Sequence, residues 1–324
     1  MKTAVLLMAY GGPNSLDELE PYLLDVRNGR PLSPGLLAEM SQRYALIGGR
    51  SPLLDITRRQ AAALEARLNR DIYDEANCFK VYVGMRHWKP YIHEALAQIS
   101  RDGFQRVVAI CMAPQASRLS TGAYRKKLED ARSALDRPLQ VEFVESWHDR
   151  PLFIQALAQK VRQAAERVPA ASLPKVRYIF SAHSLPAALL EPEDPYDPQL
   201  RATARLAAEA LGLESSQWLF CYQSAGAMDG RWLGPQIDEV LPDLAAAGVT
   251  DVLVTPIGFV AEHVEVLYDL DIEARQQAQA LGIRLYRSPS LNDAPDFIEA
   301  LTDVVYSYVP INKSNDFSRY IFNK

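Results

Sequence analysis

Histidine and carboxylate side chains follow two of the apolar runs in this sequence, and such residue types move protons or bind metal ions. His183 comes directly after the apolar run 176–182. A neutral imidazole accepts a proton near pH 7 or binds a metal ion through its free ring nitrogen. The alternative is a structural histidine whose ring only hydrogen-bonds within the turn. The sequence around His183 supports the two interpretations equally.

Three carboxylates are spaced four residues apart in the segment after the run 251–257. Glu265, Asp269 and Glu273 stand at i, i+4 and i+8, so a helix presents them along one face. Like charges at this spacing lower helix stability by a few tenths of a kcal/mol per pair. One interpretation is a solvated acidic face. The apolar residues between the carboxylates favour a path for a divalent cation, for which carboxylate oxygens are suitable ligands.

An imidazole that faces a carboxylate has two candidate functions. It can hold Fe(II), Co(II) or Zn(II) together with the carboxylate, or accept the protons that a bound metal displaces. For His87, just after the run 79–84, a structural role and a functional role are equally supported. His93 and His148 are interpreted as surface or packing residues.

The composition excludes several classes of protein. The chain has 324 residues, of which 48% are apolar and 23% charged, as in globular proteins with a buried core. Lys and Arg number 35 against 40 Asp and Glu, and the net charge of −5 argues against a nucleic-acid-binding protein. The apolar runs are shorter than the ~18 residues of a membrane span, and no signal peptide is recognisable. We therefore expect a soluble, cytoplasmic α/β protein.

Familiar motifs for cofactor binding are absent from the sequence. No GxGxxG or GxxxxGK[ST] motif supports nucleotide binding, and no GxSxG motif supports a serine nucleophile. The three cysteines, Cys78, Cys111 and Cys221, form no CxxC pair. A disulfide framework, a cysteine zinc site and an iron–sulfur cluster are therefore not expected.

Short apolar runs alternate with longer amphipathic segments along the chain. Several runs are apolar at consecutive positions, as in strands covered on both faces of a parallel sheet. Strands are expected at 3–9, 79–84, 105–113, 140–144, 175–182, 217–222, 251–257 and 284–286. Helices are expected at 57–70, 89–101, 122–135, 151–167, 198–211, 234–247 and 293–309. This alternation predicts a doubly wound parallel α/β fold.

The two halves of the sequence resemble each other. AVLLMAYGGP and VRYIFSAHSLP both run from a strand into a turn of small residues that ends in Pro. We predict two similar α/β lobes, at 1–160 and 161–309, with the ligand site at the carboxyl ends of the strands. An apolar insertion at 14–56 is expected to cover the cleft, and 310–324 is expected to be a loosely attached tail.

Several segments resemble the ferrochelatases, enzymes that insert Fe(II) into a porphyrin in haem synthesis. The matching segments are LLMAYGGP, IGGRSPL, FSAHSLP, WLGPQ and GFVAEHVEVLYDLDIE. They occur in the family's order, and the resemblance extends from residue 3 to about residue 309. It implies a class II chelatase-like fold: two Rossmann-like lobes, each a parallel four-stranded sheet flanked by helices, with a porphyrin cleft between them.

The resemblance also implies roles for the histidine and carboxylates noted above. His183 and Glu265 match the family's catalytic pair, whose members face each other across the macrocycle and bind Fe2+. Asp269 and Glu273 match an acidic line leading away from the glutamate, an auxiliary divalent-ion site or metal route. The roles of proton acceptor and metal ligand stay open between His183 and Glu265.

Tyr10 bears on which porphyrin is the substrate. Family members that act on coproporphyrin III carry Tyr here, whereas members that act on protoporphyrin IX usually carry Met. The other residues that match porphyrin contacts are Arg27, Arg43, Tyr44, Ser51 and Tyr124. Such donors suit coproporphyrin, which has four propionates where protoporphyrin has two. Gly12 departs from the pattern, because coproporphyrin-type members often have Thr there.

The resemblance thus predicts a coproporphyrin III ferrochelatase that forms Fe-coproporphyrin III (coproheme). Its expected partners are the porphyrin and Fe2+ as substrates, with no nucleic acid and no transmembrane segment. A monomer without a tightly bound cofactor and without a [2Fe–2S] cluster is expected. The alternatives are a protoporphyrin IX ferrochelatase, a cobalt or nickel chelatase of a sirohydrochlorin-type ring, and a non-catalytic porphyrin or haem carrier.

Overall fold

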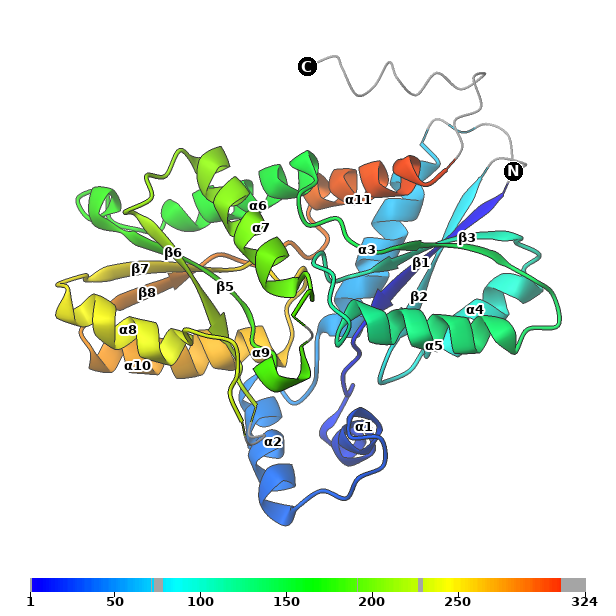
Figure 1. The fold of residues 1–324 in the computed structure, drawn as a ribbon, viewed down its shortest axis with the longest axis horizontal. Helices are drawn as coiled ribbons and strands as arrows, with labels where there is room; N and C mark the ends of the chain where they lie inside the picture. The colour runs from blue at the N-terminus through cyan, green and yellow to red at the C-terminus, as the bar shows by residue number, and fades with distance from the viewer. Residues whose placement is uncertain (1, 71, 73–77, 191, 227–229, 310–324) are drawn as a thin grey trace.

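The computed structural model describes residues 2–70, 72, 78–190, 192–226 and 230–309 (Figure 1). The tail expected at 310–324 lies outside the described residues.

Two parallel four-stranded sheets form the two halves of the molecule (Figure 1). The first has the order β2-β1-β3-β4 and the second the order β6-β5-β7-β8, so the halves repeat one topology. The strands are β1 (Thr3–Ala9), β2 (Phe79–Met85), β3 (Arg106–Cys111), β4 (Gln140–Val144), β5 (Arg177–His183), β6 (Trp218–Gln223), β7 (Asp251–Pro256) and β8 (Arg284–Arg287). All eight predicted strands are present, with ends that differ by at most two residues. The predicted fold of two similar lobes is confirmed.

Helices follow most strands and cover both faces of each sheet. They are α1 (Leu19–Val26), α2 (Pro34–Leu46), α3 (Leu53–Leu68), α4 (Ile92–Arg101), α5 (Thr121–Ser133), α6 (Pro151–Ala165), α7 (Tyr196–Leu211), α8 (Ile237–Ala246), α9 (Val264–Leu267), α10 (Arg275–Ala280) and α11 (Pro295–Ser307). A π-helix, η5 (Asp269–Ala274), joins α9 to α10. Short 3-10 turns occur at η1 (Leu16–Glu18), η3 (Leu173–Lys175) and η4 (Ala187–Leu189).

The run of consecutive apolar residues in β1 is explained by burial on both sides. Leu6 and Met8 pack into a core with α4 and α5, whereas Val5 and Leu7 pack into a second core on the opposite face. Because strand side chains alternate between faces, only a fully apolar strand can satisfy both cores.

Two helices connect the lobes. α6 contacts β7 and β8 of the second sheet, and α11 contacts both α6 and α3. The Trp147 ring lies between them, with its centroid 5.0 Å from that of Phe153 and 6.0 Å from that of Phe297. One apolar core therefore extends from the first sheet to the second. The boundary predicted between residues 160 and 161 falls inside α6 and stays a prediction.

The insertion at 14–56 folds into η1, α1, α2 and the start of α3, and α1 and α2 lie below the two sheets in Figure 1. Its apolar side chains form a small core together with Trp88, which comes shortly after β2. The members are Leu19, Tyr22, Leu23, Tyr44 and Trp88. The indole Nε1 of Trp88 donates to Glu18 Oε2 at 2.7 Å, which ties the insertion to the segment after β2.

Candidate active site

His183 is the last residue of β5, at the carboxyl end of the second sheet. Its Nε2 lies 3.4 Å from Glu265 Oε1, and its Nδ1 contacts the carbonyl oxygen of Ser184. The Tyr196 hydroxyl donates to the His183 carbonyl at 2.9 Å and so fixes the strand end. Both ring nitrogens face oxygen acceptors, which favours a protonated imidazole.

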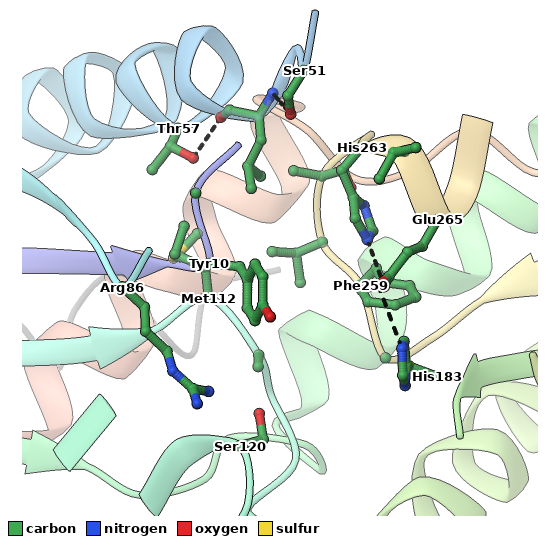
Figure 2. Close-up of a pocket in the computed structure, with 18 of the residues that line it drawn as sticks. Tyr10, Ser51, Thr57, Arg86, Met112, Ser120, His183, Phe259, His263 and Glu265 are labelled. Carbon is green, nitrogen blue, oxygen red and sulfur yellow. Dashed lines mark hydrogen bonds and ion pairs between the residues drawn. The ribbon is translucent and has the colours of Figure 1, made fainter. Parts of the chain in front are cut away.

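Glu265 lies in the first turn of α9, between two histidines (Figure 2). Its Oε2 is 3.4 Å from Nε2 of His263, and Nδ1 of His263 is 3.0 Å from the Ala261 carbonyl oxygen. Gln223 at the end of β6 donates to the Glu265 carbonyl at 2.9 Å. The two histidines therefore hold the carboxylate, and Gln223 holds the backbone of the same residue.

Phe259 supports both imidazoles from one side. Its ring centroid lies 4.3 Å from that of His263 and 6.4 Å from that of His183, both in edge-on geometry. Such contacts restrict ring rotation, so the two nitrogens stay directed at Glu265.

The charges of His183 and Glu265 stabilise each other. Burial disfavours protonation of His183, but the Glu265 carboxylate outweighs it and raises the pKa of His183 to about 9. Burial also disfavours ionisation of Glu265, yet the charge and hydrogen bond of His183 hold the pKa of Glu265 well below its ordinary value. At neutral pH the two form an ion pair.

A cavity of about 300 Å³ separates this ion pair from the first lobe. Tyr10, directly after β1, faces the ion pair from the opposite wall (Figure 2). Desolvation and the nearby Glu265 charge raise the pKa of Tyr10 to about 12, so its phenol stays protonated at neutral pH. The cavity thus has a phenol on one side and an imidazole–carboxylate pair on the other. The expectation that His183 and Glu265 face each other across the macrocycle does not agree with this geometry, because a 3.4 Å contact leaves no room for a ring between them.

The predicted porphyrin contacts divide into two groups. Tyr10, Tyr44, Ser51 and Tyr124 line the cavity, whereas Arg27 and Arg43 are not among its lining residues. Arg27 ends α1 and is exposed to solvent.

The Arg43 guanidinium makes its contacts outside the cavity. It pairs with Asp269 Oδ1 at 3.3 Å and with Glu39 at 2.9 Å, and its guanidinium lies 4.7 Å from the centre of the Tyr268 ring.

The predicted acidic line lies on a π-helix instead of a regular α-helix. The amide of Glu273 donates to the Tyr268 carbonyl at 3.0 Å, an i→i+5 bond that widens the turn. Asp269 is buried and accepts from the Ser224 hydroxyl, whereas Glu273 is exposed. Burial raises the pKa of Asp269 to about 6, and the Glu265 charge acts in the same direction against the Ser224 hydrogen bond. The line therefore runs from a buried carboxylate to a solvated one.

Sequence reasoning missed several residues of the cavity wall. Arg86 follows β2 directly, so the rule that sites lie at the carboxyl ends of strands points to it as well as to His87. His263, Phe259 and Tyr196 also line the cavity. His263 stands two residues before Glu265 in the sequence, which is the one signal that could have found it. Phe259 and Tyr196 carry no signal in a single sequence, since aromatic residues are common in cores.

Within the part of the chain that the structure describes, no group of three His, Cys, Asp or Glu side chains is arranged to hold a metal ion. His183 and Glu265 supply two donors, so a metal in this cavity needs further ligands, such as the nitrogens of a macrocycle. Among the described residues, no helix combines the length and the apolar composition that crossing a bilayer requires.

The repeated sheets and the cavity between the lobes define a class II chelatase fold. Among solved structures, the chain is similar to SirB from Bacillus subtilis with Fe3+, at a TM-score of 0.58 and 13% identity over 95% of both chains. It is also similar to CbiX, the terminal enzyme of sirohaem biosynthesis in denitrifying bacteria, at a TM-score of 0.54 and 14% identity over 95% of this chain and 100% of that one. At such low identity, these similarities show the fold alone.

The sequence comparisons are more specific. The ferrochelatase family model matches residues 2–308. A ferrochelatase from Deinococcus radiodurans is 43% identical over 301 residues, which cover 93% of this chain and 94% of that relative. A coproporphyrin III ferrochelatase from Halalkalibacterium halodurans is 40% identical over 305 residues, covering 94% of this chain and 96% of the relative. The chain belongs to the ferrochelatase family, lyases that insert a ferrous ion into a porphyrin.

Proposed function

We propose that this enzyme inserts Fe(II) into coproporphyrin III and releases Fe-coproporphyrin III (coproheme). The observation that carries the proposal is the position of Tyr10 opposite the His183–Glu265 pair (Figure 2). A tyrosine here can approach the iron axially from the face that the ion pair does not occupy. Relatives named coproporphyrin III ferrochelatase, from Halalkalibacterium halodurans and Bacillus subtilis, support the same substrate.

The polar lining of the cavity agrees with a substrate rich in carboxylates. The hydroxyls of Tyr44, Ser51 and Tyr124 all belong to the cavity wall. Hydroxyl donors hydrogen-bond carboxylates well, and coproporphyrin carries two more propionates than protoporphyrin.

Gly12 does not argue for protoporphyrin. A Cβ built on Gly12 would lie 2.6 Å from both Cβ and Oγ of Ser51. No side chain fits at that distance, so the local packing of Ser51 accounts for the glycine without reference to the substrate.

Insertion exchanges two pyrrole protons for one Fe(II), so the site must take up protons and bind the metal. At rest, His183 Nε2 faces Glu265, and a metal ion that binds this nitrogen must first displace its proton. Once that proton has passed to Glu265 or to solvent, the free nitrogen either takes a pyrrole proton or holds the incoming iron. Glu265 completes the coordination of the metal or passes protons towards Asp269 and Glu273. A cavity that binds a bent ring more tightly than a flat one lowers the barrier further.

The decisive experiment compares turnover of coproporphyrin III and protoporphyrin IX by the purified enzyme with anaerobic Fe(II), followed by the Soret band. Faster insertion into coproporphyrin III supports the proposal. Faster insertion into protoporphyrin IX assigns the enzyme to that substrate. A Soret shift without metal insertion into either porphyrin indicates a carrier. The monomeric state and cytoplasmic location stay predictions.

A further inference from the structure

The Arg86 guanidinium is a cation without a partner in the cavity wall. Its backbone is fixed on both sides, because its amide donates to the Ala9 carbonyl at 2.8 Å and its carbonyl accepts from Lys127 Nζ. Its Nε is buried and has no hydrogen-bond partner. Across the described residues, no hydrogen bond or ion pair of this guanidinium is found. A partly buried charge is costly when it stays unpaired, so a missing anionic partner is indicated.

Two aromatic rings hold the Arg86 side chain in place. Its guanidinium carbon lies 5.7 Å from the centre of the Tyr10 ring and 5.4 Å from that of the Tyr124 ring. Both distances fall within the ~6 Å range of cation–π contacts. These contacts orient the planar group but satisfy none of its N–H donors. Nε is buried, whereas the Nη donors stay available for an oxygen ligand.

Hydroxyl donors surround the same corner of the cavity. Ser120 lines the cavity at the N-cap of α5, and its side chain makes no capping hydrogen bond. Tyr124, one turn further along α5, lines the cavity too. The N-terminus of this 13-residue helix adds a favourable potential for an anion.

Arg86 lies apart from the His183–Glu265 ion pair in the cavity wall. Among the described residues that line the cavity, Arg86 is the one Arg or Lys, and Glu265, which pairs with His183, is the one carboxylate. They lie on opposite sides of Tyr10 in Figure 2. This arrangement matches a ligand with a carboxylate at its edge and a cation-binding centre. The carboxylate then lies at Arg86 and the centre lies near Glu265.

We propose that Arg86, together with the hydroxyls of Ser120 and Tyr124, forms a subsite for one propionate carboxylate of the porphyrin. This inference rests on the proposed function and names a substrate contact for it. The guanidinium fork suits a carboxylate, since two parallel N–H donors can bind both of its oxygens. Binding there fixes the rotation of the macrocycle about the axis between Tyr10 and Glu265.

The test is a binding titration of coproporphyrin III and of its tetramethyl ester, in detergent and without metal, with the Soret band as the readout. Arg86→Met should weaken binding of the free acid roughly 10- to 100-fold, the range for a charge-assisted hydrogen bond, and leave ester binding unchanged. Arg86→Lys keeps the charge without the fork and should give a smaller loss. Ser120→Ala provides a second variant if Arg86→Met does not fold, and it too should weaken only the acid.

Arg125→Met is the matched control. Arg125 lies on α5, stacks on Phe143 at 4.3 Å and pairs with Glu145 at 3.1 Å, and it does not line the cavity. This variant should bind both ligands like the wild type.

Two results would overturn the subsite. An equal loss for acid and ester in Arg86→Met means that Arg86 acts by packing on the tyrosines. No loss for either ligand means that no carboxylate binds there. Protoporphyrin IX and its dimethyl ester give the same contrast, so the subsite is tested even if turnover shows that coproporphyrin III is not the preferred substrate.

Discussion

Arg43 Nη1 and Asp269 Oδ1 lie 3.3 Å apart, although 226 residues separate them in the sequence. Arg43 belongs to α2 of the insertion, and Asp269 begins the π-helix of the second lobe. The pair therefore joins the wall of the cavity to the segment that carries the acidic line. It also explains why Arg43 is not among the residues that line the cavity.

Removing this bond should destabilise the protein. We expect Arg43→Met to lower the free energy of unfolding by about 1–2 kcal/mol, because Asp269 is left buried with a weaker set of partners. Urea denaturation at pH 7 measures the change. Arg50→Met is the control, since the Arg50–Asp55 pair at 2.7 Å is exposed on both sides and such pairs contribute about 0–1 kcal/mol. Equal losses of unfolding free energy in the two variants would show that the Arg43–Asp269 bond stabilises the protein no more than an exposed ion pair does.

His183 is expected to be required for the reaction and not for the fold. His183→Ala should lower the rate of Fe(II) insertion by about 100- to 10,000-fold, the usual range for loss of a general acid or base. Stopped-flow absorbance under anaerobic conditions measures the rate, and the melting temperature reports folding. His93→Ala, on α4 and outside the cavity wall, is the control. Normal insertion by folded His183→Ala would remove the proposed role.

The His183–Glu265 pair should make stability depend on pH with a definite sign. Because the folded-state pKa of His183 is raised from 6.5 to about 9, its contribution is fully present below pH 6.5 and is lost as the pH rises to about 9. Wild type and His183→Asn should therefore differ in unfolding free energy by about 3 kcal/mol more at pH 6 than at pH 9.5. Urea melts at these two values test this. A difference that grows towards alkaline pH would contradict the ion pair.

The acidic line is expected to serve the metal. Asp269→Asn combined with Glu273→Gln should raise the apparent KM for Fe(II) several-fold and leave the KM for the porphyrin unchanged, because the route of the cation has lost its charge. Steady-state rates over a range of Fe(II) concentrations measure this. The control, Glu129→Gln with Asp130→Asn, removes two exposed carboxylates from α5. An unchanged Fe(II) dependence in the test variant would exclude the route.

Tyr10 is expected to influence the choice of porphyrin. Tyr10→Met should lower the ratio of coproporphyrin III to protoporphyrin IX turnover several-fold, because the axial phenol is lost while the apolar volume is kept. Tyr10→Phe separates the two effects, since it removes only the hydroxyl. If both variants keep the wild-type ratio, Tyr10 does not select the substrate.

The fold was predictable from the sequence because burial leaves a strong pattern. Strands such as β1 and β7 are apolar at consecutive positions, which only a sheet covered on both faces requires. His183 was singled out because it follows an apolar run directly, and Glu265 because it begins the row of carboxylates spaced four residues apart. The π-helix was not predictable, since its apolar spacing differs little from that of an α-helix.

The sequence pattern does not predict contacts between segments that lie far apart in the chain. The pairing of Arg43 with Asp269 and the stacking of Arg86 on Tyr124 depend on how the insertion and the first lobe are placed in space. The placement of α6 and α11 between the lobes is equally invisible, because an amphipathic helix does not specify which sheet it covers.

The shared core around Trp147 has a consequence for how the product leaves. Pulling the two sheets apart would bring Trp147, Phe153 and Phe297 into water, at about 25 cal/mol for each Å² of apolar surface. The insertion packs on a smaller core of five buried side chains, so moving its helices exposes less apolar surface. We therefore expect the metallated porphyrin to leave by movement of α1 and α2 away from the cavity, while the core around Trp147 stays packed.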